Sequence, residues 1–437
     1  MRRLAACISA AVAAMLLGAV SGAPAVAGTP HAVAATGSAI GLHADYIRSD
    51  EYWLDEYGIR SAWSTTEGKG ITIAVIDTGV DGAVPDLAGA VVGGTDFSGL
   101  GSSNGQTPEG AADDRNHGTM VASLAAGRGT SASDGLIGVA PQARILSISI
   151  GFGAQATNSD EQIADAVTWA VNHGANVINM SLTRNTLTWP PSWDKAFLYA
   201  MQHNVVIVAA AGNRGSGTSE VGAPATMPGV LTVAGVDRSG HASVDASAQG
   251  ITIGVSAPSE QLLGAVPGGG FVEWAGTSGS TPIVAGVVAL VMAAHPGISA
   301  DNAINRVLVT ATDAGAKGVD PIYGYGLVNA AAAVRDTVPS VTTNPLGSLT
   351  AWIHLNRRAE ATAEPSAPPA STGKSGSGSA SARAAGTAEN PLGVLYPTST
   401  ELRNVGLPLG VLLAFAIIAA VMIVAAVRQF GRLSRRR

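Results

Sequence analysis

The chain has 437 residues and a formal net charge of −6, with 46% hydrophobic residues, 13% charged residues and 55 glycines. This composition favours a compact fold with many turns and excludes a largely disordered chain. Five arginines lie within the last ten positions, so the rest of the chain is more acidic than its net charge suggests. We therefore do not expect a nucleic-acid partner, because binding of nucleic acid usually needs a basic surface.

The first 27 residues have the pattern of a secretory signal peptide. Arg2 and Arg3 precede an apolar run over residues 4–20, and Ala-Val-Ala at 25–27 supplies the small residues of a cleavage site. The only cysteine, Cys7, lies within this segment. The mature chain is therefore expected to contain no disulfide bond.

The middle of the chain predicts a large α/β domain. Residues 28–50 form a short polar and alanine-rich N-terminal extension, and the domain is expected over residues 51–338. Residues 160–173 repeat apolar side chains at helical spacing, and six short runs are typical of strands: 73–76, 145–150, 177–180, 205–209, 231–236 and 251–255. Strands that alternate with helices predict a mostly parallel sheet with helices on both faces.

The C-terminal part of the chain predicts a membrane anchor. Residues 339–404 are rich in Pro, Ser, Ala and Gly and are typical of a flexible spacer. Residues 405–427 carry no charge and would span about 35 Å as a helix, enough to cross a bilayer. A buried core helix is the alternative, but the basic tail at 428–437 favours a transmembrane helix with a cytoplasmic C-terminus. We therefore expect a single-pass protein of the cell membrane with its large domain outside the cell.

Asp77 directly follows the first apolar strand, in the sequence Asp-Thr-Gly. The carboxyl end of a parallel strand is where open α/β sheets place their chemistry, although a solvated turn residue would have the same local sequence. Asp-Thr-Gly also occurs in aspartic proteases. Those enzymes need two such carboxylates, and the sequence has no second Asp-Thr-Gly or Asp-Ser-Gly.

His117 is the one histidine of eight that is expected to open a helix next to a glycine. Three others, His173, His203 and His295, end helical segments and are typical of C-terminal caps. A histidine at the start of a helix leaves its ring free to reach across the end of the sheet. His117 is therefore the candidate base.

Ser278 lies in a run of small residues from 276 to 281, followed by Pro282 and a long apolar stretch. Because proline suits the first turn of a helix, we expect a buried helix that begins here. At a helix N-terminus, the free N–H groups and the helix dipole favour a negative charge on a bound substrate. A simple capping role for Ser278 is the alternative.

In their chain order, Asp77, His117 and Ser278 with their flanking motifs resemble the subtilisin-like serine proteases. The resemblance covers roughly residues 50–338 and implies a subtilisin-like α/β fold and peptide-bond hydrolysis through an acyl-enzyme. It implies that Ser278 is the nucleophile, His117 the general base and then acid, and Asp77 the carboxylate that orients the imidazole. Residues 209–213 resemble the family segment whose Asn213 side chain donates to the oxyanion, although a turn residue would also fit there.

The resemblance also implies where a peptide substrate binds. A peptide would add as a strand along Ser181 and Leu182, with Gly222 in the opposite wall of the primary pocket. Where a glycine usually follows the Ser-Leu pair, this chain has Thr183, whose branched side chain should crowd the pocket. With Arg214 near the mouth, we expect small or neutral side chains before the scissile bond and a disfavour of basic ones.

Within the family, the order of segments is most similar to the mycosins, membrane-anchored subtilases associated with type VII secretion in actinobacteria. That similarity implies processing of secretion substrates and membrane proteins of the secretion machinery as partners. Any disulfides typical of mycosins are missing, because the mature chain has no cysteine. A membrane-tethered scaffold that retains a protease fold without using its activity is the alternative function.

No cofactor or metal is assigned from the sequence. Asp86 matches a calcium-ligand position of the family, but the loop over residues 129–136 lacks the Asn-rich pattern of the partner ligands.

Overall fold

The computed structural model describes residues 47–108, 112–131, 133–151 and 158–361. The expected signal peptide, most of the N-terminal extension, the expected transmembrane helix and the basic tail lie outside these residues. The chain divides into two units, residues 1–364 and 365–437, and every described residue belongs to the first unit.

A seven-stranded parallel sheet forms the centre of the described unit, as expected. Its strands lie in the order β2-β3-β1-β4-β5-β6-β7, with these bounds: β1 Thr72–Asp77, β2 Val91–Asp96, β3 Arg144–Ser149, β4 Val177–Met180, β5 Val206–Ala210, β6 Leu231–Val236 and β7 Ile253–Pro258. Ile73 of β1 pairs with Ile145 of β3 on one side and Val177 of β4 on the other. The edge strand β2 is not among the expected strands, and β7 begins two residues later than expected.

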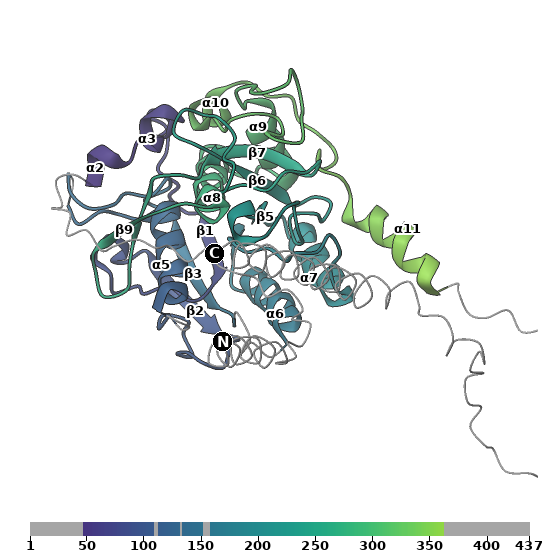
Figure 1. Ribbon diagram of the computed structural model, residues 1–437, viewed down its shortest axis with the longest axis horizontal. Coiled ribbons are helices and arrows are strands. Elements are labelled where there is room, and N and C mark those ends of the chain that lie inside the picture. Colours follow the sequence, from purple (N-terminus) through teal and green to yellow (C-terminus); the bar gives the residue numbers. More distant parts are fainter. Residues whose placement is uncertain (1–46, 109–111, 132, 152–157, 362–437) are drawn as a thin grey trace, which may run out of the picture. The chain divides into compact units, whose positions relative to one another are not determined.

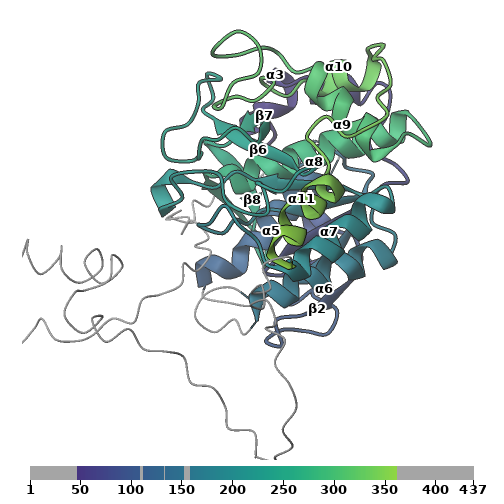
Figure 2. The same ribbon diagram turned by 90° about the vertical axis from the view of Figure 1, so that its right-hand side faces the viewer.

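Helices cover both faces of this sheet (Figures 1 and 2), which confirms the expected layers. One apolar core contains residues of α2 Ile47–Asp50, α3 Trp53–Glu56, α4 Ile59–Ala62, α5 Ala112–Ala126, α8 Thr277–Ala294, α9 Ala300–Val309 and α10 Ala330–Arg335. A second core contains residues of α6 Ser159–Asn172 and α7 Pro191–Gln202. Two short 3-10 helices, η2 Pro85–Leu87 and η4 Arg214–Ser216, and an antiparallel hairpin of β8 Leu262–Ala265 and β9 Phe271–Trp274 complete the unit.

The residues of β1 show why both faces are covered. Ile73 and Val75 pack into the first core and Ala74 and Ile76 into the second, because successive side chains of a strand point to opposite faces. Helix α8 lies against the same sheet and is buried along almost its whole length. Among the described residues, α8 is the one helix long and apolar enough to cross a membrane, and its burial identifies it as a core helix.

Part of the range expected to be a spacer is folded. Residues Leu349–Ala361 form helix α11, which packs on α7. Trp352 lies 4.3 Å from Trp189 between ring centroids, and Arg357 Nε donates to Asp194 Oδ2 at 2.7 Å. The sequence predicts a spacer here because Pro, Ser, Ala and Gly are frequent in the residues that follow this segment, whereas α11 itself is amphipathic.

Candidate active site

Asp77 is the last residue of β1, the strand at which the chain order switches from one side of the sheet to the other. Crevices at such switch points are where open α/β sheets bind ligands. The Asp77 side chain is fully buried, and the Thr78 N–H donates to its Oδ1 at 2.7 Å. The carboxylate is therefore held in place by its own turn.

His117 lies in the second turn of α5, which begins at Ala112. The expectation that His117 opens the helix is therefore wrong. The helix approaches the turn after β1 so closely that a Cβ on Gly118 would collide with the carbonyl oxygen of Gly79. The Gly118 N–H donates to Thr78 Oγ1 at 3.1 Å. The glycines of the two motifs thus allow the helix and the strand end to meet.

This close approach brings His117 and Asp77 together. His117 Nδ1 lies 2.9 Å from Asp77 Oδ1 and 3.0 Å from Oδ2, and both side chains are buried. Because a carboxylate accepts hydrogen bonds, it fixes the proton of the imidazole on Nδ1. The other ring nitrogen, Nε2, then has a lone pair on the side of the ring away from Asp77.

Ser278 is the second residue of α8, after Thr277. Gly276, which precedes the helix, has a positive φ of 145°, a conformation that favours glycine. A helix that begins here confirms the expected position of Ser278, but Pro282 lies inside the helix rather than in its first turn. Proline has no N–H, so the carbonyl of Ser278 loses its donor four residues on. The Ser181 hydroxyl replaces that donor at 2.8 Å, and the Ser278 hydroxyl donates to the Ser181 carbonyl at 3.2 Å.

Trp274, which the sequence analysis did not single out, borders both His117 and the start of α8. Its ring lies edge-on to His117 with centroids 5.8 Å apart. A Cβ on Gly279 would lie 3.4 Å from the same indole. In the sequence, the only sign of this residue's role is that it lies four positions before Ser278. Its contact with His117 depends on the fold and could not be predicted from that spacing.

Asn213 follows β5 and is tied to the first residue of α8. Its Oδ1 accepts from the Thr277 N–H at 2.8 Å and from the Thr277 hydroxyl at 2.9 Å, while Thr277 Oγ1 accepts from the Gly212 N–H at 3.1 Å. These contacts assign the oxygen of the amide to Thr277 and leave Nδ2 as its donor end. The structure therefore joins Asn213 to the residue beside Ser278, and Thr277 is a supporting residue that the sequence analysis missed.

The expected substrate-binding residues lie on two adjacent segments. The Leu182 side chain is buried in the second core, so only its backbone can face a substrate. No backbone–backbone hydrogen bond joins residues 181–183 to another described segment, which leaves this backbone available to an added strand.

Thr183 lies close to Gly222, in the expected opposite wall of the pocket, and to Gly212. A Cβ on Gly222 would lie 2.7 Å from Thr183 Oγ1, and a Cβ on Gly212 would lie 3.1 Å from Thr183 Cγ2. Thr218, not singled out from the sequence, also faces Gly212 so closely that a Cβ there would collide with its methyl group. Two threonine side chains therefore narrow this region. Arg214 Nε donates to the Ser247 carbonyl at 3.0 Å, which fixes its guanidinium.

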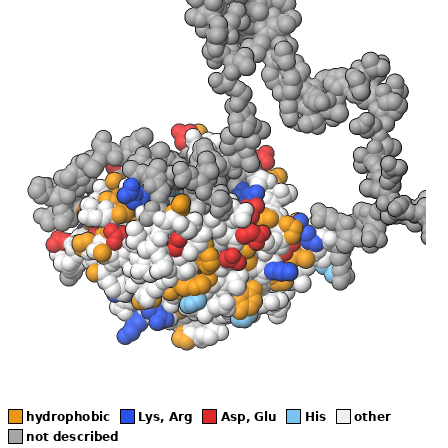
Figure 3. Space-filling view, turned by 90° about the horizontal axis from the view of Figure 1, so that it is seen from below, with side chains coloured by type: hydrophobic (Ala, Val, Ile, Leu, Met, Phe, Trp, Pro, Cys, Tyr) orange, Lys and Arg blue, Asp and Glu red, His pale blue; other side chains and the backbone are white. Residues whose placement is uncertain are grey.

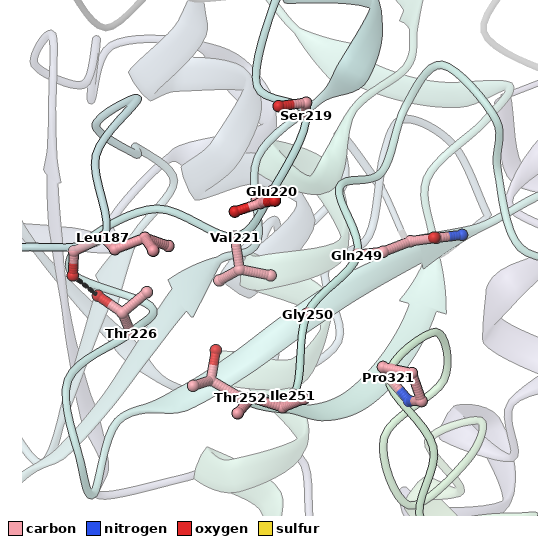
Figure 4. A pocket seen from close by; sticks show the side chains of 10 residues that line it. All are labelled: Leu187, Ser219, Glu220, Val221, Thr226, Gln249, Gly250, Ile251, Thr252 and Pro321. Carbon is pink, nitrogen blue, oxygen red and sulfur yellow. Dashed lines mark hydrogen bonds between the residues drawn. The ribbon is translucent and has the colours of Figure 1, made fainter. Parts of the chain in front are cut away.

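A separate surface hollow of about 550 Å³ is lined by Val221, the residue before Gly222 (Figure 4). Leu187, Thr226, Ile251 and Pro321 are among the residues that line it, and the Thr226 hydroxyl donates to the Leu187 carbonyl. It contains none of Asp77, His117, Ser278 or Asn213. This hollow is therefore distinct from the candidate active site.

The described residues contain no group of three or more His, Cys, Asp or Glu side chains arranged to hold a metal ion. On the face seen in Figure 3, acidic and basic side chains are interspersed rather than gathered by sign. The candidate site consists of hydroxyl, imidazole, carboxylate and amide side chains.

Comparison with known sequences places this arrangement in a family. The sequence model of the Subtilase family matches residues 68–326, which include Asp77, His117, Asn213 and Ser278. The chain belongs to the subtilase family. This confirms the resemblance inferred from the sequence, and the curated relatives of this subtilase include serine proteases.

Two relatives illustrate the extent of the similarity. The subtilase is 34% identical over 290 residues to thermitase from Thermoactinomyces vulgaris, covering 66% of this chain and 98% of thermitase. It is 34% identical over 323 residues to fervidolysin from Fervidobacterium pennivorans, covering 67% of this chain but only 45% of fervidolysin. The chain thus spans less than half the length of that relative.

Among solved structures, the subtilase is similar to MycP1 from the ESX-1 type VII secretion system. The TM-score is 0.60 and the sequence identity 30%, over 75% of this chain and 98% of MycP1. Mycosins are therefore among its structural neighbours, as the order of segments in the sequence predicted.

Proposed function

We propose that this subtilase is a membrane-anchored serine endopeptidase that uses Ser278 as nucleophile. The observation that carries the proposal is the buried pair of His117 Nδ1 and the Asp77 carboxylate, at 2.9 and 3.0 Å. The packing of a sheet does not require a buried carboxylate to hold a buried imidazole in one tautomer. Nucleophilic attack by a serine hydroxyl does require an imidazole held in this way, because the hydroxyl must give up its proton to the ring.

In the proposed mechanism, His117 Nε2 takes the proton of Ser278 Oγ as that oxygen attacks the carbonyl carbon of the scissile bond. Asp77 stabilises the imidazolium that forms. The imidazolium then protonates the leaving amine, and an acyl-enzyme remains on Ser278. Water, deprotonated by the same imidazole, hydrolyses the acyl-enzyme and restores the free hydroxyl. For this step the Ser278 hydroxyl, which donates to the Ser181 carbonyl at 3.2 Å in the structure, would donate to Nε2 instead.

Two donors would stabilise the oxyanion of the tetrahedral intermediate. One is the Nδ2 group of Asn213, whose oxygen is engaged by Thr277. The other is the Ser278 N–H, which belongs to the first turn of α8 and therefore has no carbonyl partner four residues earlier in that helix. Donors fixed in advance by the fold stabilise the developing charge without reorganisation.

The position of Thr183 supports a preference for small, uncharged side chains before the scissile bond. Its side chain is in van der Waals range of both Gly212 and Gly222, so it occupies space that a large substrate side chain would need. The substrate would bind along the backbone of residues 181–183.

Two observations support the proposed membrane and secretion roles: the sequence of the C-terminal segment and the similarity to one solved structure. An apolar segment at 405–427 with a basic tail supports a single span with the catalytic domain outside the cell. Similarity to MycP1, a protease of the ESX-1 type VII secretion system, supports substrates and partners within such a system. Membrane fractionation of the full chain and of a chain truncated after residue 404 tests the anchor: only the full chain should sediment with membranes.

Capture of substrates tests the proteolytic role. Secreted proteins should associate with the Ser278→Ala variant, and the wild-type subtilase should cut the same proteins at sites that mass spectrometry can map. Uncut proteins with a folded wild-type enzyme would instead favour the scaffold function.

A further inference from the structure

The loop between α5 and β3 is held by charged side chains from two other parts of the chain. Arg48, Glu51 and Asp86 all contact the segment that runs from Gly129 to Ile137. These three residues take no part in the proposed catalysis.

The Arg48 guanidinium lies among backbone carbonyl oxygens of this loop. Its Nε donates to the Gly135 carbonyl at 2.6 Å, and its Nη2 donates to the carbonyls of Asp134 at 3.1 Å and Ser131 at 3.3 Å. A Cβ on Gly129 would collide with Nη2, so the glycine leaves the space that the guanidinium fills. Three backbone carbonyl oxygens gathered around one charged group are otherwise typical of a site for a hard cation.

Two buried carboxylates accept hydrogen bonds from the backbone of the same loop. Glu51 Oε1 accepts from the Ile137 N–H at 2.8 Å, while Oε2 is buried without a hydrogen bond and lies 3.9 Å from Arg48 Nε. Asp86 Oδ1 accepts from the Leu136 N–H at 2.7 Å. Glu51 Oε2 thus has the Arg48 guanidinium as its ion-pair partner.

The segment that carries Arg48 is firmly docked. Ile47 and Trp53, on either side of it, are fully buried in the first core. The side chain of Arg48 is therefore positioned by its neighbours, and the guanidinium cannot be lost by dilution or by chelation, as a bound ion can.

We propose that Arg48 serves as a built-in cation in what is otherwise a calcium site, and that removing its side chain creates a site that binds Ca²⁺. The ligands of the new site are the carbonyl oxygens of Ser131, Asp134 and Gly135 together with the carboxylates of Glu51 and Asp86. Five oxygens with added water satisfy the six to eight ligands that Ca²⁺ takes. The wild-type chain holds the loop without added metal.

Thermal unfolding of the purified full-length chain tests this, in EDTA and in Ca²⁺. The wild type should unfold at the same temperature in both. In EDTA, Arg48→Ala should unfold roughly 4–8 °C lower, because it loses three charge-assisted hydrogen bonds. Calcium should restore most of that loss, with half-saturation at roughly 0.1–1 mM.

Three further variants separate a calcium site from a general effect on stability. Arg48→Ala with Asp86→Asn should not respond to Ca²⁺. Arg335→Ala, which removes an exposed arginine that donates to the Ser61 hydroxyl, should respond no more than the wild type. Arg48→Lys keeps a positive charge, so its unfolding temperature in EDTA should lie between those of the wild type and Arg48→Ala. It replaces the alanine variant in this test if that variant folds poorly in EDTA. An unchanged unfolding temperature of Arg48→Ala, or a loss that Ca²⁺ does not reverse, would overturn the proposal, as would an equal response of the wild type to Ca²⁺.

Discussion

Ser181 and Ser278, which are 97 positions apart, exchange two hydrogen bonds: each hydroxyl donates to the other residue's carbonyl oxygen. The exchange joins the end of β4 to the start of α8 and so fixes the substrate-binding segment relative to the proposed nucleophile. It is possible because Pro282 leaves the Ser278 carbonyl without a helical donor. Asn179 Nδ2 supports the arrangement by donating to Ser181 Oγ at 3.0 Å.

Replacing Ser181 with alanine should therefore destabilise the fold. The substitution leaves the buried Ser278 carbonyl without a partner, which typically costs about 1–3 kcal/mol in the free energy of unfolding. Denaturant unfolding measures this. Ser64→Ala is the matched control, since the Ser64 hydroxyl makes only a local, exposed bond to the Ser61 carbonyl and should change stability little. Equal effects of the two substitutions would contradict the role given to Ser181.

Asn213→Ala should lower kcat about 10²- to 10³-fold, or roughly 3–4 kcal/mol, because it removes one donor to the oxyanion. Steady-state hydrolysis of a peptide substrate measures the loss. Thr277→Val provides the comparison: it removes one of the two donors that hold the Asn213 oxygen, so the amide is less firmly oriented but still present. Its loss should be clearly smaller. An unaffected rate in Asn213→Ala would remove Asn213 from the site.

Thr183→Gly should widen the specificity of the enzyme. Without the threonine side chain, the space between Gly212 and Gly222 opens, and leucine or phenylalanine before the scissile bond can enter. We expect kcat/KM for these residues to rise at least about tenfold relative to alanine, the scale on which extra methylene groups are discriminated. A peptide library read by mass spectrometry measures the ratio. Thr188→Gly, on the exposed loop that follows, should leave it unchanged.

Trp352→Ala should release α11 from α7 without a large effect on catalysis. The substitution removes the ring pair with Trp189 and costs roughly 1–3 kcal/mol of local stability. Hydrogen exchange should speed up over residues 349–357, while kcat/KM stays within about twofold. Leu355→Ala, at a position 72% exposed on the same helix, is the control and should leave exchange nearly unchanged. Unaltered exchange in Trp352→Ala would contradict the docking of α11.

The elements that could be predicted from the sequence are those whose pattern is local. Strands β4 and β6 were predicted at their observed bounds, and β1, β3 and β5 within a residue, because short apolar runs bounded by turns are unambiguous in a buried sheet. Strand β2 was missed because two adjacent glycines interrupt it at the edge of the sheet. Its place beside β3, like the strand order as a whole, depends on long-range pairing that no local pattern encodes.

The same division holds for the site. Asp77, His117 and Ser278 were found through flanking motifs, and the glycines of those motifs turn out to permit the close approach of α5 to the end of β1. Thr277, Trp274 and Thr218 were missed because their importance lies in contacts with residues far along the chain. The N-terminus of α5 was misplaced because the residues before His117 are polar and do not show the apolar spacing that marks a helix.

Labelling with a fluorophosphonate probe tests the central claim most directly, because the probe reacts only with a serine hydroxyl that a neighbouring base activates. The folded wild-type chain should be labelled at one site, which peptide mapping assigns to Ser278. Ser278→Ala and His117→Ala should both remain folded and unlabelled. A folded wild type that takes up no label, or a label on any residue other than Ser278, would contradict the account.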